Sequence, residues 1–291
     1  MSNQKEIRAR ISSTISTQQI TKAMKLVSAT KLRKASEAIQ RMRPYAIKLQ
    51  GIMSNLQESG DDERLAVYFN QRDVKKVALV VITSDRGLCG AFNSNVVKRA
   101  KLLLENDYKA LVASGNVELI CIGKKGAETM RRLGYTVNTT YQSLLVDINA
   151  DKAFNCAQEL IQQFVSGDID KLEVVYNQFK NAATQIIQNE ILLPVAAPQN
   201  STKSIGDYIF EPSKVEILEE LIPRSLKTQL YRALLDSLAS EHGARMVAMD
   251  KATENAGDLL KALKLAYNQA RQAAITREIS EIVGGVAALE G

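Results

Sequence analysis

The segment at residues 84–90 has the residue types and position of a possible phosphate-binding turn. Residues 76–83 (KVALVVIT) form a continuous apolar run typical of a strand buried on both faces. The sequence SDRGLCG follows, and then a helical pattern. A strand, a glycine turn and a helix start can together bind phosphate. However, Gly87 and Gly90 give only G-x-x-G, and Gly123-Lys124-Lys125-Gly126 also lacks the P-loop spacing.

Other candidates for chemistry are few. His242 is the only histidine, lies inside a helical pattern and has no partner for a nucleophile or metal site, so we expect a helix-packing or surface role. Asp61 and Asp62 lie in a polar stretch and are expected to be solvated in a loop. The three cysteines, Cys89, Cys121 and Cys156, are widely spaced, which favours reduced thiols. The sequence therefore predicts a non-enzyme without cofactor or metal.

The elements around this turn predict a mixed α/β domain over residues 74–195. Helical patterns cover residues 94–112, 125–133 and 150–165, and a second strand covers residues 117–123. Residues 171–178 and 183–193 read as a hairpin or as adjacent strands. Strands that alternate with helices predict a parallel or mixed sheet covered by helices, a Rossmann-like architecture. Four prolines between Pro194 and Pro223 predict a linker and foot segment over residues 196–223.

Both ends of the chain predict long helices, over residues 1–58 and 224–291. Apolar residues recur three and four apart in both segments, with no proline before Pro44 or after Pro223. Two such helices bury their apolar stripes best against each other, so we expect a long antiparallel coiled coil beside the α/β domain. The alternative is that each pattern breaks into several helices. Pro44 supports a break or kink in the first, whereas only Gly243 and Gly257 weaken the second.

The charge is unevenly distributed. The whole chain carries a formal net charge of +6, yet in the first 50 residues eleven basic residues face two acidic ones, a balance of +9. A basic helix of this kind indicates an acidic partner, either nucleic acid, anionic lipid or an acidic protein surface. The alternative is a helix face that is merely solvated, but such a face would normally carry both acidic and basic residues.

The last residues of the chain are apolar. Residues 282–289 (IVGGVAAL) carry no charge, although only Glu290 and Gly291 follow. A free terminus gains nothing from apolar residues in water, so we expect this tip to insert into a partner rather than fold back on the central domain. No run of 18 apolar residues and no signal peptide is present, so a membrane span is not expected.

Several motifs together are similar to one known family. They are IRARI (7–11), QITKAMKLVSA (19–29), TSDRGLCG (83–90), EHGARMVAMDKATEN (241–255) and YNQARQAAITREISE (267–281). In this order, and along the whole chain, they resemble the gamma subunit of F-type ATP synthases of the bacterial type.

The resemblance implies a non-catalytic rotor subunit that binds no nucleotide. Its coiled coil would be the central shaft that couples proton-driven rotation of a membrane ring to ATP synthesis or hydrolysis at the beta subunits. Its partners would be the alpha and beta subunits of the catalytic hexamer, the epsilon subunit and the ring of c subunits. No nucleic acid would bind, and the membrane would be reached only through the complex, at the cytoplasmic face of the bacterial inner membrane.

The resemblance also assigns contact residues. Met24 and Lys25, with Asp85, Arg86 and Cys89 of the loop, would face the acidic helix-turn-helix lever of beta. Polar contacts with beta loops would come from Arg245, Arg271, Gln272, Thr276 and Glu278. Tyr208, in the segment DYIFEP (207–212), would lie at the foot, near the c ring and the epsilon subunit.

The sequence departs from the family pattern at a few points. Val286 stands where alanine is usual, and Ser16 where asparagine is usual. The plastid form's insert with a cysteine pair is absent, so thiol control is not expected. The short start before the first motif favours a bacterial protein. Two other function classes stay open from the residues themselves: a nucleic-acid-binding coiled coil, and a nucleotide-dependent enzyme built on the α/β domain.

Overall fold

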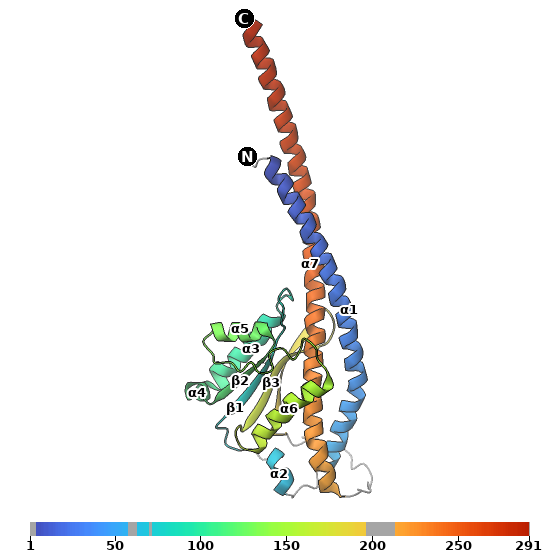
Figure 1. Cartoon of the computed structure of the whole chain (residues 1–291), viewed down its shortest axis with the longest axis vertical. Coiled ribbons are helices and arrows are strands. Elements are labelled where there is room, and N and C mark those ends of the chain that lie inside the picture. The colour runs from blue at the N-terminus through green and yellow to red at the C-terminus, as the bar shows by residue number, and fades with distance from the viewer. Residues whose placement is uncertain (1–3, 58–62, 70–71, 196–212, 291) are drawn as a thin grey trace. The chain divides into compact units, whose positions relative to one another are not determined.

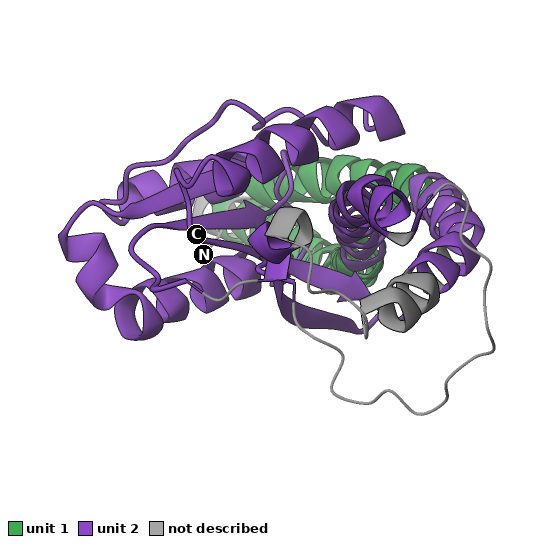
Figure 2. Cartoon of the chain, turned by 90° about the horizontal axis from the view of Figure 1, so that it is seen from below, with its two compact units in different colours: residues 1–28, 246–291 green, residues 29–245 purple. Residues whose placement is uncertain are grey.

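The computed structural model describes residues 4–57, 63–69, 72–195 and 213–290. Two long helices, α1 (Gln4–Gln57) and α7 (Lys214–Glu290), form the first and last elements of the described chain (Figure 1). The chain divides into two compact units, coloured separately in Figure 2. We call residues 1–28 and 246–291 the helical unit and residues 29–245 the α/β unit, and describe each by itself.

The α/β unit is built on a four-stranded sheet of order β2-β1-β3-β4. Its strands are β1 (Val77–Ile82), β2 (Val117–Ile122), β3 (Lys171–Phe179) and β4 (Gln185–Leu193). β1 lies between β2 and β3 and is parallel to both, and β4 pairs antiparallel with β3 as a hairpin. Every residue of β1 is buried, as its continuous apolar run predicts.

Helices cover both faces of this sheet. On one face, α3 (Phe92–Leu102) and α5 (Lys124–Arg132) pack on Val77, Leu79 and Val81 (Figure 1). On the other, α6 (Ala150–Val165) and the start of α7 pack on the alternate residues of β1, among them Val80 and Ile82. The predicted mixed α/β architecture is thus confirmed, with a core on each side of the sheet.

The helix predicted over residues 94–112 is divided in the structure. α3 ends at Leu102, a π-helical turn η1 (Leu103–Asp107) follows, and α4 (Lys109–Ala113) begins after Tyr108. The amide of Tyr108 donates to the carbonyl of Leu103 at 2.9 Å, five residues back. Leu103, Leu104 and Tyr108, which flank or form this wider turn, are all buried.

The C-terminal helix starts earlier than the sequence predicted. α7 begins at Lys214 and contains Pro223, whereas the prediction placed a linker up to residue 223. An interior proline costs about 3 kcal/mol. Leu218, Ile222, Leu226 and Leu230, spaced four apart, are all buried in the core beside α6, and their burial outweighs that cost.

The first helix is likewise continuous. α1 runs through Pro44, so the alternative of several separate helices is not realised. Within the α/β unit, Ala35 and Ile39 of α1 pack with Leu235 and Ala239 of α7. A short helix α2 (Glu63–Phe69) precedes the sheet, and the carbonyl of its Tyr68 accepts a hydrogen bond from Val195 at 2.8 Å.

In the helical unit, the N-terminal part of α1 and the C-terminal part of α7 pack as an antiparallel pair. Buried and half-buried positions of α1 recur at the 3.5-residue average spacing of a coiled coil, and those of α7 do the same. On α1 they are Ile7, Ile11, Thr14, Gln18, Thr21, Lys25 and Ser28; on α7 they are Met249, Thr253, Ala256, Leu260, Leu263, Tyr267 and Ala270.

Polar pairs in this seam define its register. The hydroxyl of Thr253 is 2.8 Å from that of Thr21, and Nζ of Lys25 is 2.5 Å from Oδ1 of Asp250. Residue numbers increase along α1 from 21 to 25 where they decrease along α7 from 253 to 250, so the two helices are antiparallel. A polar residue at a seam position fixes register because any shift would leave its group unpaired.

The C-terminal part of α7 exposes apolar side chains. Ile279, Ile282 and Val283 are 56%, 67% and 61% exposed, and Val286 is exposed as well. Among the described residues, none of the helices combines the length and the apolar character needed to cross a bilayer.

Candidate functional site

The loop at residues 84–90 is fixed from within. The hydroxyl of Ser84 donates to the carbonyl of Arg86 at 2.7 Å, and its backbone amide donates to Oδ1 of Asn93 at 2.9 Å. The amide nitrogen of the Asn93 side chain lies 3.3 Å from Sγ of Cys89. These contacts tie both ends of the loop to the first turn of α3.

Arg245 of α7 holds the outer part of the same loop. Its Nη2 donates to the carbonyl of Arg86 at 2.9 Å, and its Nε to the carbonyl of Gly87 at 3.3 Å. Its Nη1 forms an ion pair with Oε1 of Glu241 at 2.7 Å, and both side chains are less than a tenth exposed. The guanidinium is thus a buried clamp, since all three nitrogens are bound within the chain.

Two titratable groups beside this clamp have shifted pKa values. Burial, and then the charges of Arg245 and Lys31, lower the pKa of His242 to about 4. The histidine is therefore neutral at pH 7, with its Nδ1 3.3 Å from Nη1 of Arg245. Burial raises the pKa of Glu241, against the opposing effect of the Arg245 charge. His242 is a packing residue, one of the two roles that the sequence predicted.

The start of α5 follows strand β2 and a glycine, a second position at which the free amides of a helix can bind phosphate, and here the chain itself fills that position. The backbone amides of Lys124, Lys125 and Gly126 donate to Oδ1 of Asp85 at 3.1 Å, to the Ser84 carbonyl at 3.0 Å and to the Thr83 hydroxyl at 2.8 Å. A Cβ at Gly126 would lie 2.5 Å from that hydroxyl oxygen. The Asp85 carboxylate thus occupies the place of a phosphate oxygen.

The crevice at the carboxyl ends of β1 and β3 is also filled. In open α/β sheets, ligands bind where the strand order reverses, which here is between these two strands. Asn177 is buried there and donates to the Phe92 carbonyl at 3.2 Å, and the Ser240 hydroxyl of α7 donates to the Asn177 carbonyl at 3.0 Å. Gly243 permits this approach, because a Cβ there would lie 3.1 Å from Cα of Ala182.

Comparison with known proteins identifies the family. A family model described as ATP synthase matches residues 3–289. The ATP synthase gamma chains of Cytophaga hutchinsonii and Flavobacterium johnsoniae are both 53% identical to this chain, over 99% and 100% of each sequence respectively. The chain belongs to the ATP synthase gamma chain family.

Solved structures show the same fold. The central stalk of the Tetrahymena thermophila mitochondrial ATP synthase, solved with its c ring, contains a chain that is 26% identical, with a TM-score of 0.58 over 80% of this chain and 99% of that one. A chain of the Euglena gracilis mitochondrial ATP synthase, at 21% identity, gives a TM-score of 0.67 over 98% of this chain and 94% of that one. The predicted fold class, long terminal helices plus a Rossmann-like α/β domain, is thus confirmed.

The contact residues expected of a gamma chain differ in accessibility. Arg86 is exposed and Asp85 half-buried, whereas Cys89 is buried, and burial raises the pKa of its thiol. Arg245 is buried in its clamp rather than presented outward. In the helical unit Met24 and Lys25 are half-buried, and the four remaining predicted residues of α7 (Arg271, Gln272, Thr276 and Glu278) are exposed. Tyr208 lies outside the described residues, as do Asp61 and Asp62.

Sequence reasoning missed two residues outside this loop that help to hold it. Asn93 of α3 binds Ser84, and Glu241 of α7 pairs with Arg245, whereas Leu88 lies within the loop that the sequence singled out and is 65% exposed. The spacing of Glu241 and Arg245, four apart on a helix, was a readable sign of an ion pair. Nothing in the local sequence pointed to Asn93, whose role depends on the fold.

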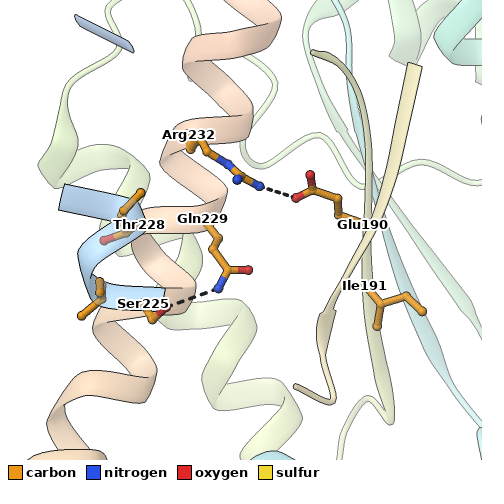
Figure 3. A pocket seen from close by; sticks show the side chains of 8 residues that line it. Glu190, Ile191, Ser225, Thr228, Gln229 and Arg232 are labelled. Carbon is orange, nitrogen blue, oxygen red and sulfur yellow. Dashed lines mark hydrogen bonds and ion pairs between the residues drawn. The ribbon is translucent and has the colours of Figure 1, made fainter. Parts of the chain in front are cut away.

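A polar cavity of about 350 Å³ lies beside β4 and α7 (Figure 3). Nη2 of its Arg232 is paired with Oε2 of Glu190 at 2.7 Å, and Gln229 donates to Ser225 at 3.3 Å. Oε1 of Glu190 also accepts from the Tyr176 hydroxyl at 2.7 Å. These groups therefore pair with one another, although Nε of Arg232 is buried without a hydrogen-bond partner. Across the described ranges, no cluster of three or more histidine, cysteine or acidic side chains could hold a metal ion.

Proposed function

We propose that this chain is the central rotor subunit of an ATP synthase and has no catalytic site of its own. It would transmit the proton-driven rotation of a ring of c subunits to the beta subunits of an alpha–beta hexamer, which make or hydrolyse ATP. The epsilon subunit would be a further partner. The chain would be peripheral, at the cytoplasmic face of a bacterial inner membrane. The observation that carries this proposal is the helical unit, with its narrow seam and exposed C-terminal residues.

A shaft that turns inside a protein sleeve needs internal register and an outer surface that contacts its surroundings. The Thr21–Thr253 and Lys25–Asp250 pairs supply the register. The outer surface is supplied by exposed side chains of both kinds, apolar at Ile279 and Ile282 and charged at Arg271. The apolar part of this surface is unfavourable in water and is favoured when a partner surrounds it.

The charge of α1 supports an acidic protein partner. Arg33 and Lys34 in the α/β unit, and Lys22 in the helical unit, are all exposed. They would attract the acidic lever of the beta subunits, together with the exposed Arg86 of the loop. Steep salt-dependent binding of DNA by the purified chain would instead favour a nucleic-acid-binding protein.

The absence of catalysis is proposed from the filled phosphate position at the start of α5. Purified, contaminant-free chain should hydrolyse no ATP and bind no nucleotide at millimolar concentration. Turnover that disappears in an Asp85→Ala or Arg86→Ala variant would overturn this part of the proposal.

Assembly is the most direct test of the rotor function. Expression with the catalytic and ring subunits of the same organism should give a complex that contains this chain and both groups of partners. The purified complex should couple ATP hydrolysis to proton pumping. A chain that reaches neither group of subunits under conditions in which they assemble would rule the proposal out.

The exposed polar residues of α7 should act during rotation rather than during assembly. Arg271→Glu should reduce coupled ATP synthesis more than it reduces the yield of complex, because a charged hydrogen bond contributes about 1.5–3 kcal/mol. Lys264→Glu is the matched control, an exposed cation on the same helix with no proposed contact. Normal synthesis by the Arg271→Glu complex would show that this contact is dispensable.

The apolar end of α7 should change its environment on assembly. Amide hydrogen exchange over residues 282–286 should be fast in the free chain, where these side chains are exposed, and slow in the complex. Burial at about 25 cal/mol per Å² of apolar surface would then contribute to assembly. Strong protection of these amides already in the free chain would contradict docking.

A further inference from the structure

A cavity of about 540 Å³ opens at the amino ends of β1 and β2, at the opposite end of β1 from the loop at residues 84–90. It is formed mainly by η1, α4, the start of β2 and residues 134–138, all within the α/β unit. A volume of this size is typical of small-molecule sites. Neither the family motifs nor the contacts expected of a gamma chain involve the residues that line it.

The cavity is an open end of a hydrophobic core. Leu104 and Leu119 are buried members of the core between the sheet, α3 and α5. Val112, Val117 and Val137 pack against the same core but are only half-buried, and all five side chains line the cavity. A further apolar group placed against these valines would remove apolar surface from water, which is favourable.

Two glycine turns leave the mouth of the cavity open. Gly115 lies between α4 and β2, and Gly134 follows α5. A Cβ at either position would meet no atom within 4 Å, so both turns border open space. An apolar chain can therefore enter between them.

The edge of β2 is closed to a peptide that would add a strand. The backbone amide of Asn138 donates to the Leu119 carbonyl at 2.8 Å, and the Cys121 amide donates to the Asn138 carbonyl at 3.1 Å. Segment 134–138 of the chain thus already pairs with the outer side of β2. A partner that binds through backbone hydrogen bonds finds these groups occupied, which favours a small ligand.

The charged residues at the cavity indicate the head group of such a ligand. Lys76 and Glu118 both line it. Glu118 is already paired, since its Oε1 accepts from the side-chain amide of Asn138 at 2.9 Å. Lys76 is exposed and supplies a positive charge beside the apolar lining. One ammonium group suits one carboxylate or phosphate as a point charge.

We propose that this cavity binds a single-chain amphiphile with an anionic head group, of the fatty acid or lysophospholipid class. The aliphatic chain lies against the three valines, and the head group pairs with Lys76. The site belongs to the chain by itself and does not depend on the proposed rotor function. Failure of the chain to assemble with partner subunits would therefore leave this inference intact.

Laurate, a soluble fatty acid, and dodecanol, its uncharged counterpart, are the probes. Calorimetric titration of the full chain with laurate should show one saturable site below the micelle-forming concentration, and laurate should raise the melting temperature. Dodecanol should bind about 10-fold more weakly, because it lacks the charge that pairs with Lys76. Absence of saturable laurate binding, or equal affinity for the two probes, would overturn the proposal.

Two neighbouring lysines give a matched pair of variants. The backbone amides of Lys75 and Lys76 both donate to Oδ2 of Asp170 at 2.9 Å, and both residues are exposed, but only Lys76 lines the cavity. Lys76→Gln should weaken laurate binding about 10-fold and leave dodecanol binding unchanged. Lys75→Gln should change neither. An equal loss of laurate binding in both variants would overturn the proposal.

The apolar part of the site is tested by filling it and by direct observation. Val112→Phe and Val137→Phe should each weaken both probes about 10-fold, because the added ring occupies the space of the chain. Methyl NMR of the wild type needs no variant: laurate should shift the signals of Val112, Val117 and Val137. The signal of Val81, at the other end of β1 in the same core, should not move. Shifts that spare the three lining valines would contradict the site.

The source of the ligand is decided by competition. Lysophosphatidylglycerol that displaces laurate at the lower concentration would identify a membrane-derived lipid as the preferred ligand. Displacement only at the higher concentration would identify a free fatty acid. Failure of lysophosphatidylglycerol and palmitate alike to displace laurate would overturn the assignment to this class.

Discussion

The α/β unit and the helical unit bury their side chains very differently. The α/β unit encloses both faces of a sheet, with Tyr176 and Phe164 fully buried. In the helical unit, the buried described residues are Ile7, Thr21, Ser28, Met249 and Ala256, of which two are polar. A narrow seam of this kind yields little burial energy per residue. We therefore expect the α/β unit to gain its stability from its own core, whereas the helical unit gains most from what surrounds it.

The two units also use their charges differently. In the α/β unit, Arg245 and Glu241 are paired inside the protein and define the shape of a loop. In the helical unit, Arg271 and Glu278 are exposed. Buried charges shape the chain, and exposed ones remain available to a partner. Each of the following measurements should differ between the two units.

The largest difference should come from truncating a buried aromatic residue. Phe164→Ala in α6 should lower the free energy of unfolding by about 3–5 kcal/mol, because it leaves a cavity at a site with 0% exposure. Ile279→Ala, at a site that is 56% exposed, should change it by less than about 0.5 kcal/mol. Chemical denaturation followed by circular dichroism measures both. Equal costs would contradict the comparison.

Breaking the buried clamp should have the next largest effect. Arg245→Met should destabilise the α/β unit by about 3 kcal/mol, since Glu241 is left buried without its cation and two loop carbonyls lose a donor. Arg271→Met, which removes an exposed cation from the same helix, should cost less than about 0.5 kcal/mol. If both substitutions cost the same, Arg245 is not a clamp.

Acid should destabilise the α/β unit through His242. Its folded pKa of about 4 lies below the ordinary value of 6.5, so between these values the unfolded chain binds a proton that the folded chain does not. Stability should therefore fall from pH 7 to pH 5, by about 1–2 kcal/mol from this residue.

His242→Gln isolates the histidine contribution. Glu241, with its raised pKa, takes up a proton on folding and acts in the opposite direction, and it is present in both proteins. The variant should lose less stability than the wild type between pH 7 and pH 5. An identical pH dependence in the two proteins would show that His242 is not buried as a neutral ring.

The smallest effect on the free chain should come from removing the end of α7. A stop after Glu281 should change the unfolding free energy by less than about 0.5 kcal/mol, because the described side chains beyond it, residues 282–286, are exposed. The same truncation should lower the yield of assembled complex. A clear loss of stability in the isolated chain would place these residues in its own core.

The sequence by itself determined the elements whose signals are local. The apolar run of β1, the span of α6 and the repeat of apolar residues at both ends of the chain follow from periodicity, which depends only on neighbouring residues. The family was also readable, because its motifs are contiguous segments. The division of the predicted helix at η1 and the start of α7 at Lys214 could not be read from the sequence. Both depend on the burial of side chains, Tyr108 and Ile222, against distant elements.

The tertiary structure alone decided what the loop residues do. Asp85, Cys89 and Arg245 were all predicted as outward contacts, and nothing in their spacing indicates that Asp85 binds the start of α5 or that Arg245 points inward to two carbonyls. Asp85 binds Lys124, and Arg245 binds Arg86 and Gly87. In both cases the partners are far apart in the sequence. Hydrogen bonds and burial between distant segments depend on the packed fold, so local sequence patterns predict which residues are polar but not which of them remain exposed.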